Sequence, residues 1–267
     1  MENKSRNLLT IDDENVILEA VKRVGTAEGW KVDTATDATQ GFQMVQKNSY
    51  DLCLCDIMLP DMDGFQFLEK LRESEIDLPV IMTTGFATIE NAVKSLDMGA
   101  IDYLPKPFTV DEVLSTLYRG FRFVDLKKRQ IETDSDVNSI IVPCPLQYKH
   151  LGFQSWISID YDGSVKIGAT DLFLKIINSI KTVNLLPLEA EILQGFSCAE
   201  FEADDELIHQ LMAPMSGQII RVNEKIKEDL SQLEKDPYFN GWLYIIVPKN
   251  LNYELKYLSG CHNIFGR

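Results

Sequence analysis

The stretch LCLCDIMLPDMDG, residues 52–64, is the most informative part of this sequence. Its first six residues form a nearly continuous apolar run, which is typical of a strand buried on both faces of a parallel sheet. Only Asp56, close to the end of the run, interrupts it. Residues 64–75 then have helical spacing, so we expect a buried strand that ends at a carboxylate and is followed by a helix.

The same alternation of strand and helix occurs on both sides of this stretch. Expected strands cover residues 8–11, 30–36, 79–84 and 101–104, and expected helices cover 14–29, 37–48, 87–100 and 109 to about 130. Gly29 and Gly99 are typical helix-terminating residues, and Thr109 is a typical N-cap. Five buried strands that alternate with five helices predict an α/β domain with a five-stranded parallel sheet and right-handed crossovers.

The carboxyl ends of the expected strands carry polar residues, and ligands of such sheets bind beyond these ends. The residues are Asp12 and Asp13 after the first strand, Asp56 at the third, Thr83 and Thr84 at the fourth, and Lys106 after the fifth. Three carboxylates at one edge repel one another unless a cation lies between them, and the hard ion Mg²⁺ suits oxygen ligands. Carboxylates can form aspartyl-phosphates, so Asp56 is a candidate nucleophile and Lys106 a candidate partner for phosphoryl charge.

Residues 6–125 resemble the receiver domain of two-component response regulators. The matching stretches are TIDDEN (10–15), LCLCDIMLPDMDG (52–64), VIMTTGFATIENAV (80–93) and GAIDYLPKPF (99–108). The resemblance implies a flavodoxin-like fold and Mg²⁺-dependent phosphoryl transfer to Asp56 from a sensor histidine kinase or a phosphotransfer protein. It also implies that Asp12 and Asp13 bind the metal together with Asp56, with Asp13 as a direct ligand. The backbone carbonyl of Met58 would complete the protein ligands.

The resemblance further implies which residues respond to phosphorylation. Thr84 would be the switch hydroxyl that contacts the phosphate, and Thr83 is its competitor for this role. Tyr103 would be the aromatic residue that moves with the switch, or simply a half-buried aromatic of its strand. Lys106 would pair with the phosphate, and the Lys106–Pro107 bond would be cis.

The second half of the chain has a different pattern. Residues 127–146 are polar and interrupted by Pro143 and Pro145, so we expect an inter-domain linker there. Short β-rich runs follow at 155–160, 164–169, 217–222 and 242–247, with a hairpin signal at Asp162-Gly163 and short helices near 171–180 and 224–232. These runs predict a mainly β domain.

Residues 147–247 resemble the glycine-cleavage H protein, a β hammerhead that carries lipoate on a hairpin lysine. The matching stretches are IGATDLFLKII (167–177), LLPLEAEI (185–192), APMSGQIIRVNEKI (213–226) and DPYFNGWLYII (236–246). The position that corresponds to the lipoyl lysine is Glu206, and no lysine occurs between Lys181 and Lys225. A carboxylate cannot form the amide that anchors lipoate, so the resemblance implies a carrier domain that binds no lipoate.

Five of the seven residues in Glu200–Glu206 are acidic. They are either a solvated hairpin or a docking surface for a basic protein partner. His209, just beyond, is expected to be a surface residue rather than a catalyst. The domain contains no enzyme signature that we recognise.

Composition excludes several classes of protein. The 267 residues include 26 basic and 41 acidic residues, a formal net charge of −15. The acidity argues against nucleic-acid binding, which requires concentrated Lys and Arg. The sequence has no apolar run of the roughly 20 residues needed to span a membrane, and its N-terminus lacks the apolar core of a secretory signal. The five cysteines are too scattered for a disulfide framework, and Cys144, Cys198 and Cys261 are expected to stand alone.

Together these observations predict a cytoplasmic, bacterial response regulator with a receiver domain at 1–126, a linker at 127–146, an H-protein-like domain at 147–258 and a C-terminal tail at 259–267. The second domain is expected to act as a protein-interaction output with an unknown partner. The alternatives are a phospho-regulated metabolic carrier and a transcriptional regulator. Apart from phosphorylation and dephosphorylation at Asp56, no enzyme activity, nucleic acid or membrane is expected, and a homodimer is kept open.

Overall fold

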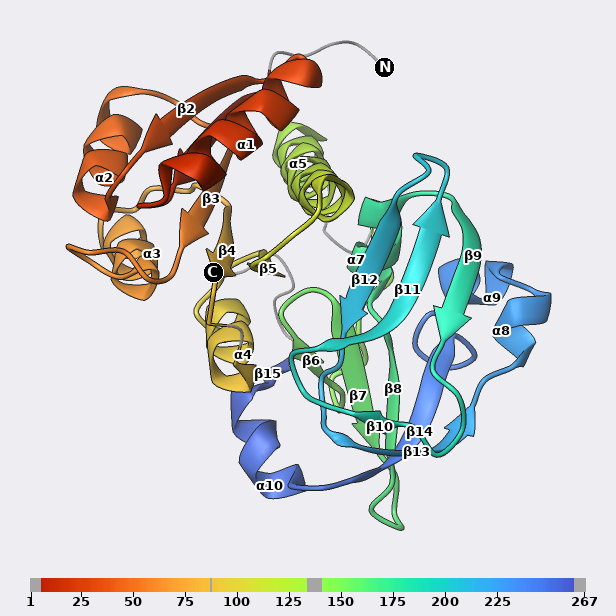
Figure 1. Cartoon of the computed structure of the whole chain (residues 1–267). Helices are drawn as coiled ribbons and strands as arrows, with labels where there is room; N and C mark the ends of the chain where they lie inside the picture. The colour runs from red at the N-terminus through yellow and green to blue at the C-terminus, as the bar shows by residue number, and fades with distance from the viewer. Residues whose placement is uncertain (1–5, 87, 134–140, 262–267) are drawn as a thin grey trace. The chain divides into compact units, whose positions relative to one another are not determined.

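The computed structural model describes residues 6–86, 88–133 and 141–261 (Figure 1). The chain divides into two compact units, one with residues 1–87 and 98–125 and the other with residues 88–97 and 126–267. Each unit is described by itself. Helix α4 (Ile89–Asp97) is described with the first sheet, because it connects two of its strands.

The first sheet has five parallel strands in the order β2-β1-β3-β4-β5. Its strands are β1 (Asn7–Ile11), β2 (Lys31–Ala35), β3 (Leu52–Asp56), β4 (Val80–Thr84) and β5 (Asp102–Pro105). The connecting helices are α1 (Asn15–Ala27), α2 (Ala38–Lys47), α3 (Gly64–Glu73) and α4, and α5 (Val110–Thr133) follows β5. This architecture confirms the predicted five-stranded parallel α/β fold.

Burial and capping explain why these elements form. Every residue of β3 and β4 is buried, as their apolar runs require. Asp63 and Gln66 form a capping box at the start of α3. Thr109 and Glu112 exchange hydrogen bonds in the same way before α5, which confirms the N-cap expected at Thr109.

The second unit is mainly β, as predicted. One antiparallel sheet has the order β10-β13-β14-β8-β7-β6-β15, and a three-stranded sheet has the order β12-β11-β9. The strands of the larger sheet are β6 (Lys149–Leu151), β7 (Ser155–Ile159), β8 (Val165–Ala169), β10 (Glu191–Ile192), β13 (Gly217–Val222), β14 (Trp242–Pro248) and β15 (Ser259–Gly260). Those of the smaller sheet are β9 (Ile180–Leu185), β11 (Ser197–Ala203) and β12 (Ile208–Met212).

Short helices lie between these strands. They are α7 (Asp171–Ile177), α8 (Lys225–Glu228), α9 (Ser231–Lys235) and α10 (Leu251–Glu254), followed by a 3₁₀ turn, η1 (Leu255–Tyr257). The expected hairpin joins β7 to β8, and Gly163 adopts a φ of 84° in its turn. That left-handed conformation explains why glycine stands there.

The core of the second unit includes an aromatic cluster around Trp156. The indole stacks on Tyr148 with ring centroids 5.0 Å apart and donates a hydrogen bond to the carbonyl of Ala169. Gly168 lies under the ring, because a Cβ at this position would meet Trp156 atoms at 2.4 Å. The absence of a side chain at Gly168 therefore lets β8 pack directly against the indole.

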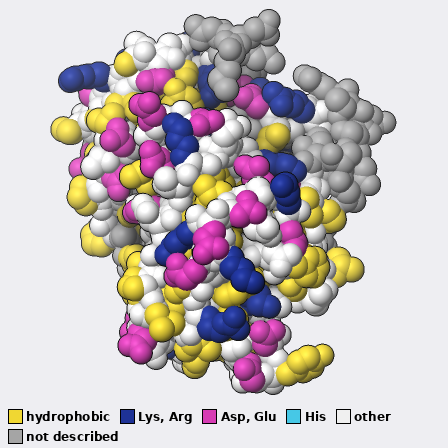
Figure 2. Space-filling view, turned by 90° about the vertical axis from the view of Figure 1, so that its right-hand side faces the viewer, with side chains coloured by type: hydrophobic (Ala, Val, Ile, Leu, Met, Phe, Trp, Pro, Cys, Tyr) yellow, Lys and Arg dark blue, Asp and Glu magenta, His cyan; other side chains and the backbone are white. Residues whose placement is uncertain are grey.

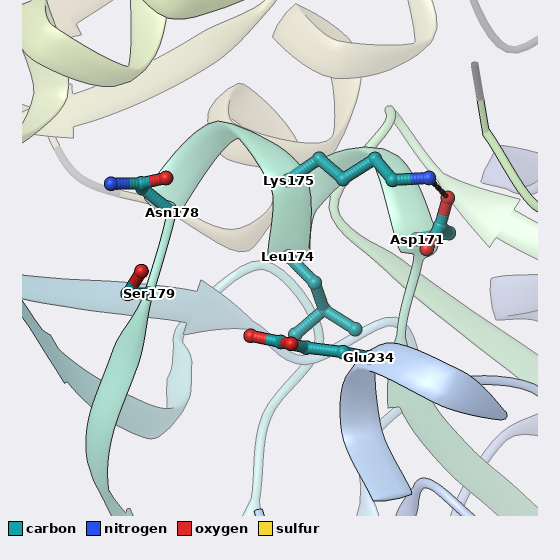
Figure 3. A pocket seen from close by; sticks show the side chains of 6 residues that line it. All are labelled: Asp171, Leu174, Lys175, Asn178, Ser179 and Glu234. Atoms are coloured by element: carbon teal, nitrogen blue, oxygen red, sulfur yellow. Dashed lines mark hydrogen bonds and ion pairs between the residues drawn. The ribbon is translucent and has the colours of Figure 1, made fainter. Parts of the chain in front are cut away.

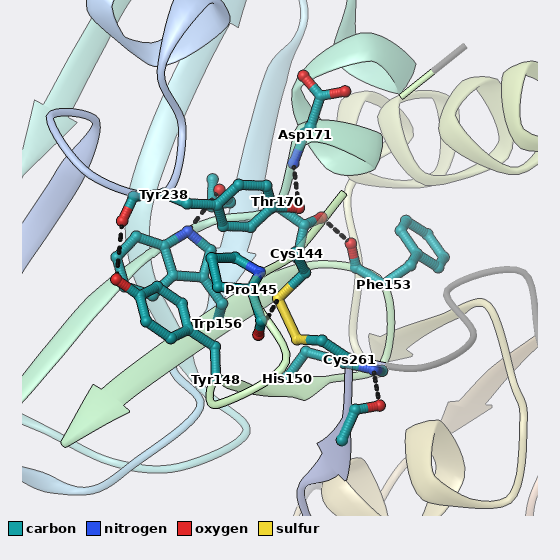
Figure 4. Close-up of a disulfide and its surroundings, with 12 residues drawn as sticks. Cys144, Pro145, Tyr148, His150, Phe153, Trp156, Thr170, Asp171, Tyr238 and Cys261 are labelled. Atoms are coloured by element: carbon teal, nitrogen blue, oxygen red, sulfur yellow. Dashed lines mark hydrogen bonds between the residues drawn. A yellow bond between two sulfur atoms is a disulfide. The ribbon is translucent and has the colours of Figure 1, made fainter. Parts of the chain in front are cut away.

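Cys144 and Cys261 form a disulfide beside this cluster (Figure 4). The expectation that both cysteines stand alone is therefore wrong. They are 117 residues apart, and sequence reasoning had no signal to pair them because only the fold brings them together. Cys198, the third of these cysteines, is free and buried.

The ends of the second unit are more structured than the expected linker and tail. Helix α5 continues to Thr133, residues 134–140 lie outside the described part, and Ile141 is buried. Beyond residue 258, β15 pairs with β6 before Cys261 enters the disulfide. The structured part of the second unit thus extends beyond residues 147 and 258, the bounds that the sequence suggested for this domain.

Charged side chains of both signs are interspersed on the face shown in Figure 2. Within the described part of the chain, no helix combines the length and the apolar sequence that crossing a membrane would require.

Candidate functional site

The parallel strands of the first sheet bring the predicted site residues to one edge. Asp12 directly follows β1, and Asp56 is the last residue of β3. Asp56 lies beside Thr83 in the register of β3 and β4, and Thr84 lies beside Pro105 in that of β4 and β5. Because parallel strands end at the same side, residues that are far apart in sequence become neighbours here.

Three carboxylates form a cluster at this edge. One carboxylate oxygen from each of Asp12, Asp13 and Asp56 lies within 4.8 Å of the other two. Asp12 and Asp56 are buried, whereas Asp13 is exposed. Burial raises the pKa of the Asp12 carboxyl, against the opposing effect of Lys106. The cluster is a set of hard oxygen donors with one open side, which fits Mg²⁺.

Lys106 holds two of these carboxylates together. Its Nζ lies 2.7 Å from Asp12 Oδ2 and 2.7 Å from Asp56 Oδ2, and its side chain is almost fully buried. Burial alone would lower the pKa of Lys106, but hydrogen bonds and charge attraction from both carboxylates outweigh it and raise the pKa. Lys106 is therefore a fixed cation beside the expected phosphoacceptor. The Lys106–Pro107 bond is cis, as the resemblance implied.

Glu14 is a further member of the site that sequence reasoning did not identify. Its carboxylate lies 3.2 Å from Lys106 Nζ, while most of its side chain is exposed. The available signal was its position in the run Asp12-Asp13-Glu14. Glu14 thus adds one more carboxylate to this edge, at the position directly before α1.

Thr84, the expected switch hydroxyl, is the last residue of β4, and Tyr103, the expected switch aromatic, lies in β5. Thr84 is buried, and its hydroxyl oxygen accepts a hydrogen bond of 3.1 Å from the Phe86 backbone N–H. Tyr103 is 4% exposed, rather than half-buried, and its phenol has no hydrogen-bond partner among the described residues. Burial, followed by the nearby Asp56 charge, raises the pKa of Tyr103 to about 12. The competing Thr83 hydroxyl is also buried, without a hydrogen-bond partner in the described part of the chain.

The chain that follows Asp56 is held close to it. The Met58 backbone N–H donates to Asp56 Oδ1 at 3.1 Å, and the Gly64 N–H donates to the Ile57 carbonyl at 2.9 Å. A Cβ at Gly64 would lie 2.5 Å from the Asp56 carbonyl oxygen, so only glycine allows α3 to begin this close to β3. The Met58 carbonyl stands two residues from Asp56, where the resemblance places a metal ligand.

In the second unit, Glu206 lies in the tight turn that joins β11 to β12. Its backbone N–H donates to the Ala203 carbonyl at 3.1 Å, and its φ is 63°. Beside the turn, Lys181 lies 3.7 Å from Asp204, and the Thr182 hydroxyl donates to Glu202 at 3.1 Å. Two of the acidic residues in Glu200–Glu206 therefore have a polar partner within the domain.

His209 is not the surface residue that its sequence context suggested. Its side chain is fully buried, and Nε2 lies 3.2 Å from Asp205 Oδ2. The alternation of β12 points this residue inward, where an imidazole requires a polar partner. The contact between His209 and Asp205 thus connects the β11–β12 turn to strand β12.

A pocket adjoins the turn of the same hairpin (Figure 3). It is lined by Asp171, Leu174, Lys175, Asn178, Ser179 and Glu234. The Ser179 carbonyl accepts a hydrogen bond from the Asp204 N–H, and Lys175 pairs with Asp171 at 2.7 Å. The lining residues contain neither a thiol nor an imidazole.

Comparison with known proteins identifies both halves of the chain. Residues 8–118 match the family "response regulator receiver domain", and residues 147–264 match the family "glycine cleavage H-protein". The chain is therefore a response regulator receiver domain followed by a glycine-cleavage H-protein domain.

Curated relatives match the receiver half. The transcriptional regulatory protein DltR of Streptococcus agalactiae is 38% identical over 110 residues, which are 41% of this chain and 49% of DltR. The response regulator MprA of Mycobacterium ulcerans is 31% identical over 136 residues, 51% of this chain and 56% of MprA. The chain thus spans about half the length of the curated relatives it matches.

Solved structures also match this half. A CheY-like receiver domain protein from Methanospirillum hungatei is 32% identical, and the match covers 48% of this chain and 99% of that protein with a TM-score of 0.44.

Proposed function

We propose that this protein accepts a phosphoryl group on Asp56 from a sensor histidine kinase or a phosphotransfer protein. The observation that carries the proposal is the buried Asp56 carboxylate, paired with Lys106 at 2.7 Å and clustered with Asp12 and Asp13. Three carboxylates and a lysine at the same sheet edge as the buried Thr84 hydroxyl suit the transfer of a phosphoryl group.

Phosphoryl transfer follows from the roles of these side chains. An Asp56 carboxylate oxygen attacks the phosphorus of a phosphohistidine, the new O–P bond forms, the P–N bond breaks, and the imidazole leaves. Asp12, Asp13, Asp56 and the Met58 carbonyl would hold Mg²⁺, which supplies positive charge for the phosphoryl oxygens. Lys106 is placed to exchange its contact with Asp56 for one with the phosphoryl group.

The phosphoryl group would then act as a switch through Thr84. Its buried hydroxyl accepts the Phe86 N–H and retains its own proton, which it would donate to a phosphoryl oxygen. Movement of Thr84 toward the phosphate would leave space for Tyr103, whose phenol has no hydrogen-bond partner within residues 6–86, 88–133 and 141–261. Phosphorylation would thereby bias the α4–β5–α5 face between two conformations.

Incubation with acetyl phosphate and Mg²⁺ tests the phosphoacceptor assignment. We expect one phosphoryl group per chain by intact mass, no mass gain in Asp56→Asn, and loss of the gain when EDTA removes Mg²⁺. Phosphorylation of Asp56→Asn to the same extent as the wild type would contradict the assignment. Asp51→Asn, just before β3, is the matched control and is expected to be phosphorylated.

For the second domain we propose a protein-interaction output that carries no lipoate. Support comes from Glu206 in the turn between β11 and β12, the place that the H-protein resemblance gives to the lipoyl lysine. The acidic residues around the turn suit a basic protein partner. A phospho-regulated metabolic carrier is the second candidate, because the domain matches the H-protein family as far as residue 264.

Co-expression with a lipoate ligase and lipoate separates these two candidates. We expect the wild-type chain to gain no lipoyl mass and Glu206→Lys to gain one, because the variant restores the amine in the tight turn. Glu202→Lys, on β11 near the turn, is the control for lysine addition outside the turn position. A lipoyl mass gain in the wild type would favour the carrier.

Transcriptional control through DNA is the remaining alternative, and the negative charge of both halves disfavours it. Residues 1–130 carry 15 basic and 22 acidic residues, and residues 131–267 carry 11 and 19. We expect no salt-dependent DNA shift with the phosphorylated chain; a shift that weakens as salt rises would favour DNA binding.

We propose that the protein is located in the cytoplasm, because the kinase domain that donates the phosphoryl group would be found there. Disulfides are uncommon in the reducing cytosol. Alkylation of cells at lysis, followed by mass spectrometry of the Cys144 and Cys261 peptides, tests the location. Reduced cysteines fit the cytosol, whereas a quantitative disulfide would indicate an oxidising compartment.

A further inference from the structure

We propose that Asp61 is a positioning residue of the phosphoacceptor site, which ties the loop carrying Met58 to helix α2. The inference rests on the proposed function, because it assigns to Asp61 the task of holding a metal-binding loop. Asp61 itself is exposed, lies five residues beyond Asp56, and was not among the site residues expected from the sequence.

The contacts of Asp61 cross between two loops at the carboxyl edge of the sheet. Its carboxylate accepts hydrogen bonds from the backbone N–H groups of Ala38, at 3.1 Å, and Thr39, at 2.9 Å, and from the Thr39 hydroxyl. These N–H groups belong to the first turn of α2, where they have no partner inside the helix. Burial by itself would raise the pKa of Asp61, but the hydrogen bonds from Thr39, Met62 and Ala38 together outweigh it and lower the pKa to about 2.

Helix α2 has a cap of its own, so Asp61 does not merely replace a missing one. Asp37, the N-cap residue, accepts the Gln40 N–H at 2.7 Å. The two aspartates thus bind different N–H groups of the same turn. Asp37 stabilises the helix from within its own segment, whereas Asp61 connects the helix to the loop between β3 and α3.

The loop from residue 57 to residue 63 is held at both ends by other contacts. At its start, the Ile57 N–H donates to the Thr83 carbonyl at 2.8 Å, and the Met58 N–H donates to Asp56. At its end, Asp63 caps α3. Asp61 supplies the hydrogen bonds that join the middle of this loop to a separate helix. The Met58 side chain is 53% exposed and so contributes little to holding the loop.

This arrangement predicts a specific effect on metal binding. Without the Asp61 contacts, the loop is free to shift, and the Met58 carbonyl samples positions away from the carboxylates of the cluster. Removal of a group that orients a metal ligand typically weakens metal binding by 10- to 100-fold. For an exposed carboxylate acting through one carbonyl, we expect the lower end, about tenfold.

The test compares Asp61→Ala with Asp37→Ala in the full-length chain. Both variants remove a carboxylate from the N-terminus of α2, but only Asp61→Ala releases the loop. The Mg²⁺ Kd is measured by isothermal titration calorimetry, and the rate of phosphorylation by acetyl phosphate is measured as a function of Mg²⁺ concentration. Melting temperatures establish that both variants are folded at the assay temperature.

We expect Asp61→Ala to raise the Mg²⁺ Kd about tenfold while the phosphorylation rate at saturating Mg²⁺ stays near the wild-type value. Asp37→Ala is expected to keep the Mg²⁺ Kd within about twofold, since its effect is confined to helix capping. An unchanged Kd in Asp61→Ala, or an equal rise in both variants, would overturn the proposal. If Asp61→Ala fails to fold, Thr39→Val, which removes only the hydroxyl donor, replaces it with the same expected direction.

Failure of this inference differs from failure of the proposed function. A wild-type chain that binds Mg²⁺ and becomes phosphorylated, together with an unaffected Asp61→Ala, removes only the role of Asp61. A wild-type chain that is not phosphorylated at any Mg²⁺ concentration removes the proposed function.

Discussion

At the scale of single residues, the site concentrates negative charge around one cation. Asp12 and Asp56 are buried and share Lys106, and Asp13 adds a third carboxylate at the open side. Burial raises the pKa of Asp12, against the lowering effect of Lys106. A cation bound by the three carboxylates would reduce the cost of keeping them charged at this edge.

The first prediction concerns the metal. Because a ligand that binds only the folded state stabilises it, Mg²⁺ at about ten times its Kd is expected to add about 1.4 kcal/mol to the free energy of unfolding. Asp13→Asn is expected to abolish this gain and to raise the melting temperature slightly in EDTA, since one repulsive charge is gone. Differential scanning calorimetry with Mg²⁺ and with EDTA measures both effects. Glu19→Gln, exposed on α1, is the control and should keep the full Mg²⁺ response.

The second prediction concerns Tyr103 and pH. Its pKa is raised from the usual value of 10 to about 12, so the folded state keeps its proton where the unfolded state has lost it. This contribution is fully present below pH 10 and is lost as the pH rises from 10 to 12. Tyr103→Phe is expected to lose less stability than the wild type over that interval, by roughly 2–3 kcal/mol. Urea unfolding at pH 9 and pH 11.5 checks this, and equal losses would argue against a buried phenol.

At the scale of elements, how well a strand could be predicted from the sequence depended on how that strand is buried. Strands β3 and β4 are buried on both faces, so their apolar runs were visible in the sequence. Strand β9 has only one buried residue, and β10 and β15 contain two residues each. Their pairing depends on neighbours far along the chain, so periodicity alone did not reveal them.

The third prediction concerns the hairpin of β11 and β12. Glu206 has a φ of 63°, a left-handed conformation that costs a residue with a side chain about 1–2 kcal/mol. Glu206→Gly removes this strain but increases the entropy of the unfolded chain, so we expect a net gain of about 0.5–1 kcal/mol. Glu206→Ala, which keeps the strain, serves as the control. Chemical denaturation compares the two variants, and no advantage of Gly over Ala would contradict the described turn.

At the scale of the whole molecule, two domains of different construction lie on one chain. The receiver half depends on local βα units, whereas the second domain joins its first and last segments. Strand β15 pairs with β6, and the disulfide of Cys144 and Cys261 adds a covalent link beside the Trp156 cluster. The second domain therefore depends on contacts between distant parts of its sequence.

The fourth prediction concerns this link. A disulfide between residues 117 apart restricts the unfolded chain, and loops of this size correspond to about 4–5 kcal/mol in the chain-entropy description. Cys144→Ser is expected to lower the stability of the second domain by up to this amount while phosphorylation of Asp56 continues. Denaturant unfolding with and without a phosphine reductant measures the loss. The reductant should destabilise the wild type and leave Cys144→Ser unaffected; a wild type that is insensitive to reductant would speak against the disulfide.

By itself, the sequence determined the receiver fold and the sheet edge where the candidate site lies. Asp12, Asp56, Thr84 and Lys106 lie at or directly after the ends of strands whose burial and direction are encoded locally, so their convergence could be foreseen. The tertiary structure alone decided the pairing of Cys144 with Cys261, the buried position of His209 and the contact of Asp61 with helix α2. These depend on which segments meet in space, because hydrogen bonds and disulfides require a partner within a few ångströms, and local periodicity carries no information about such a partner.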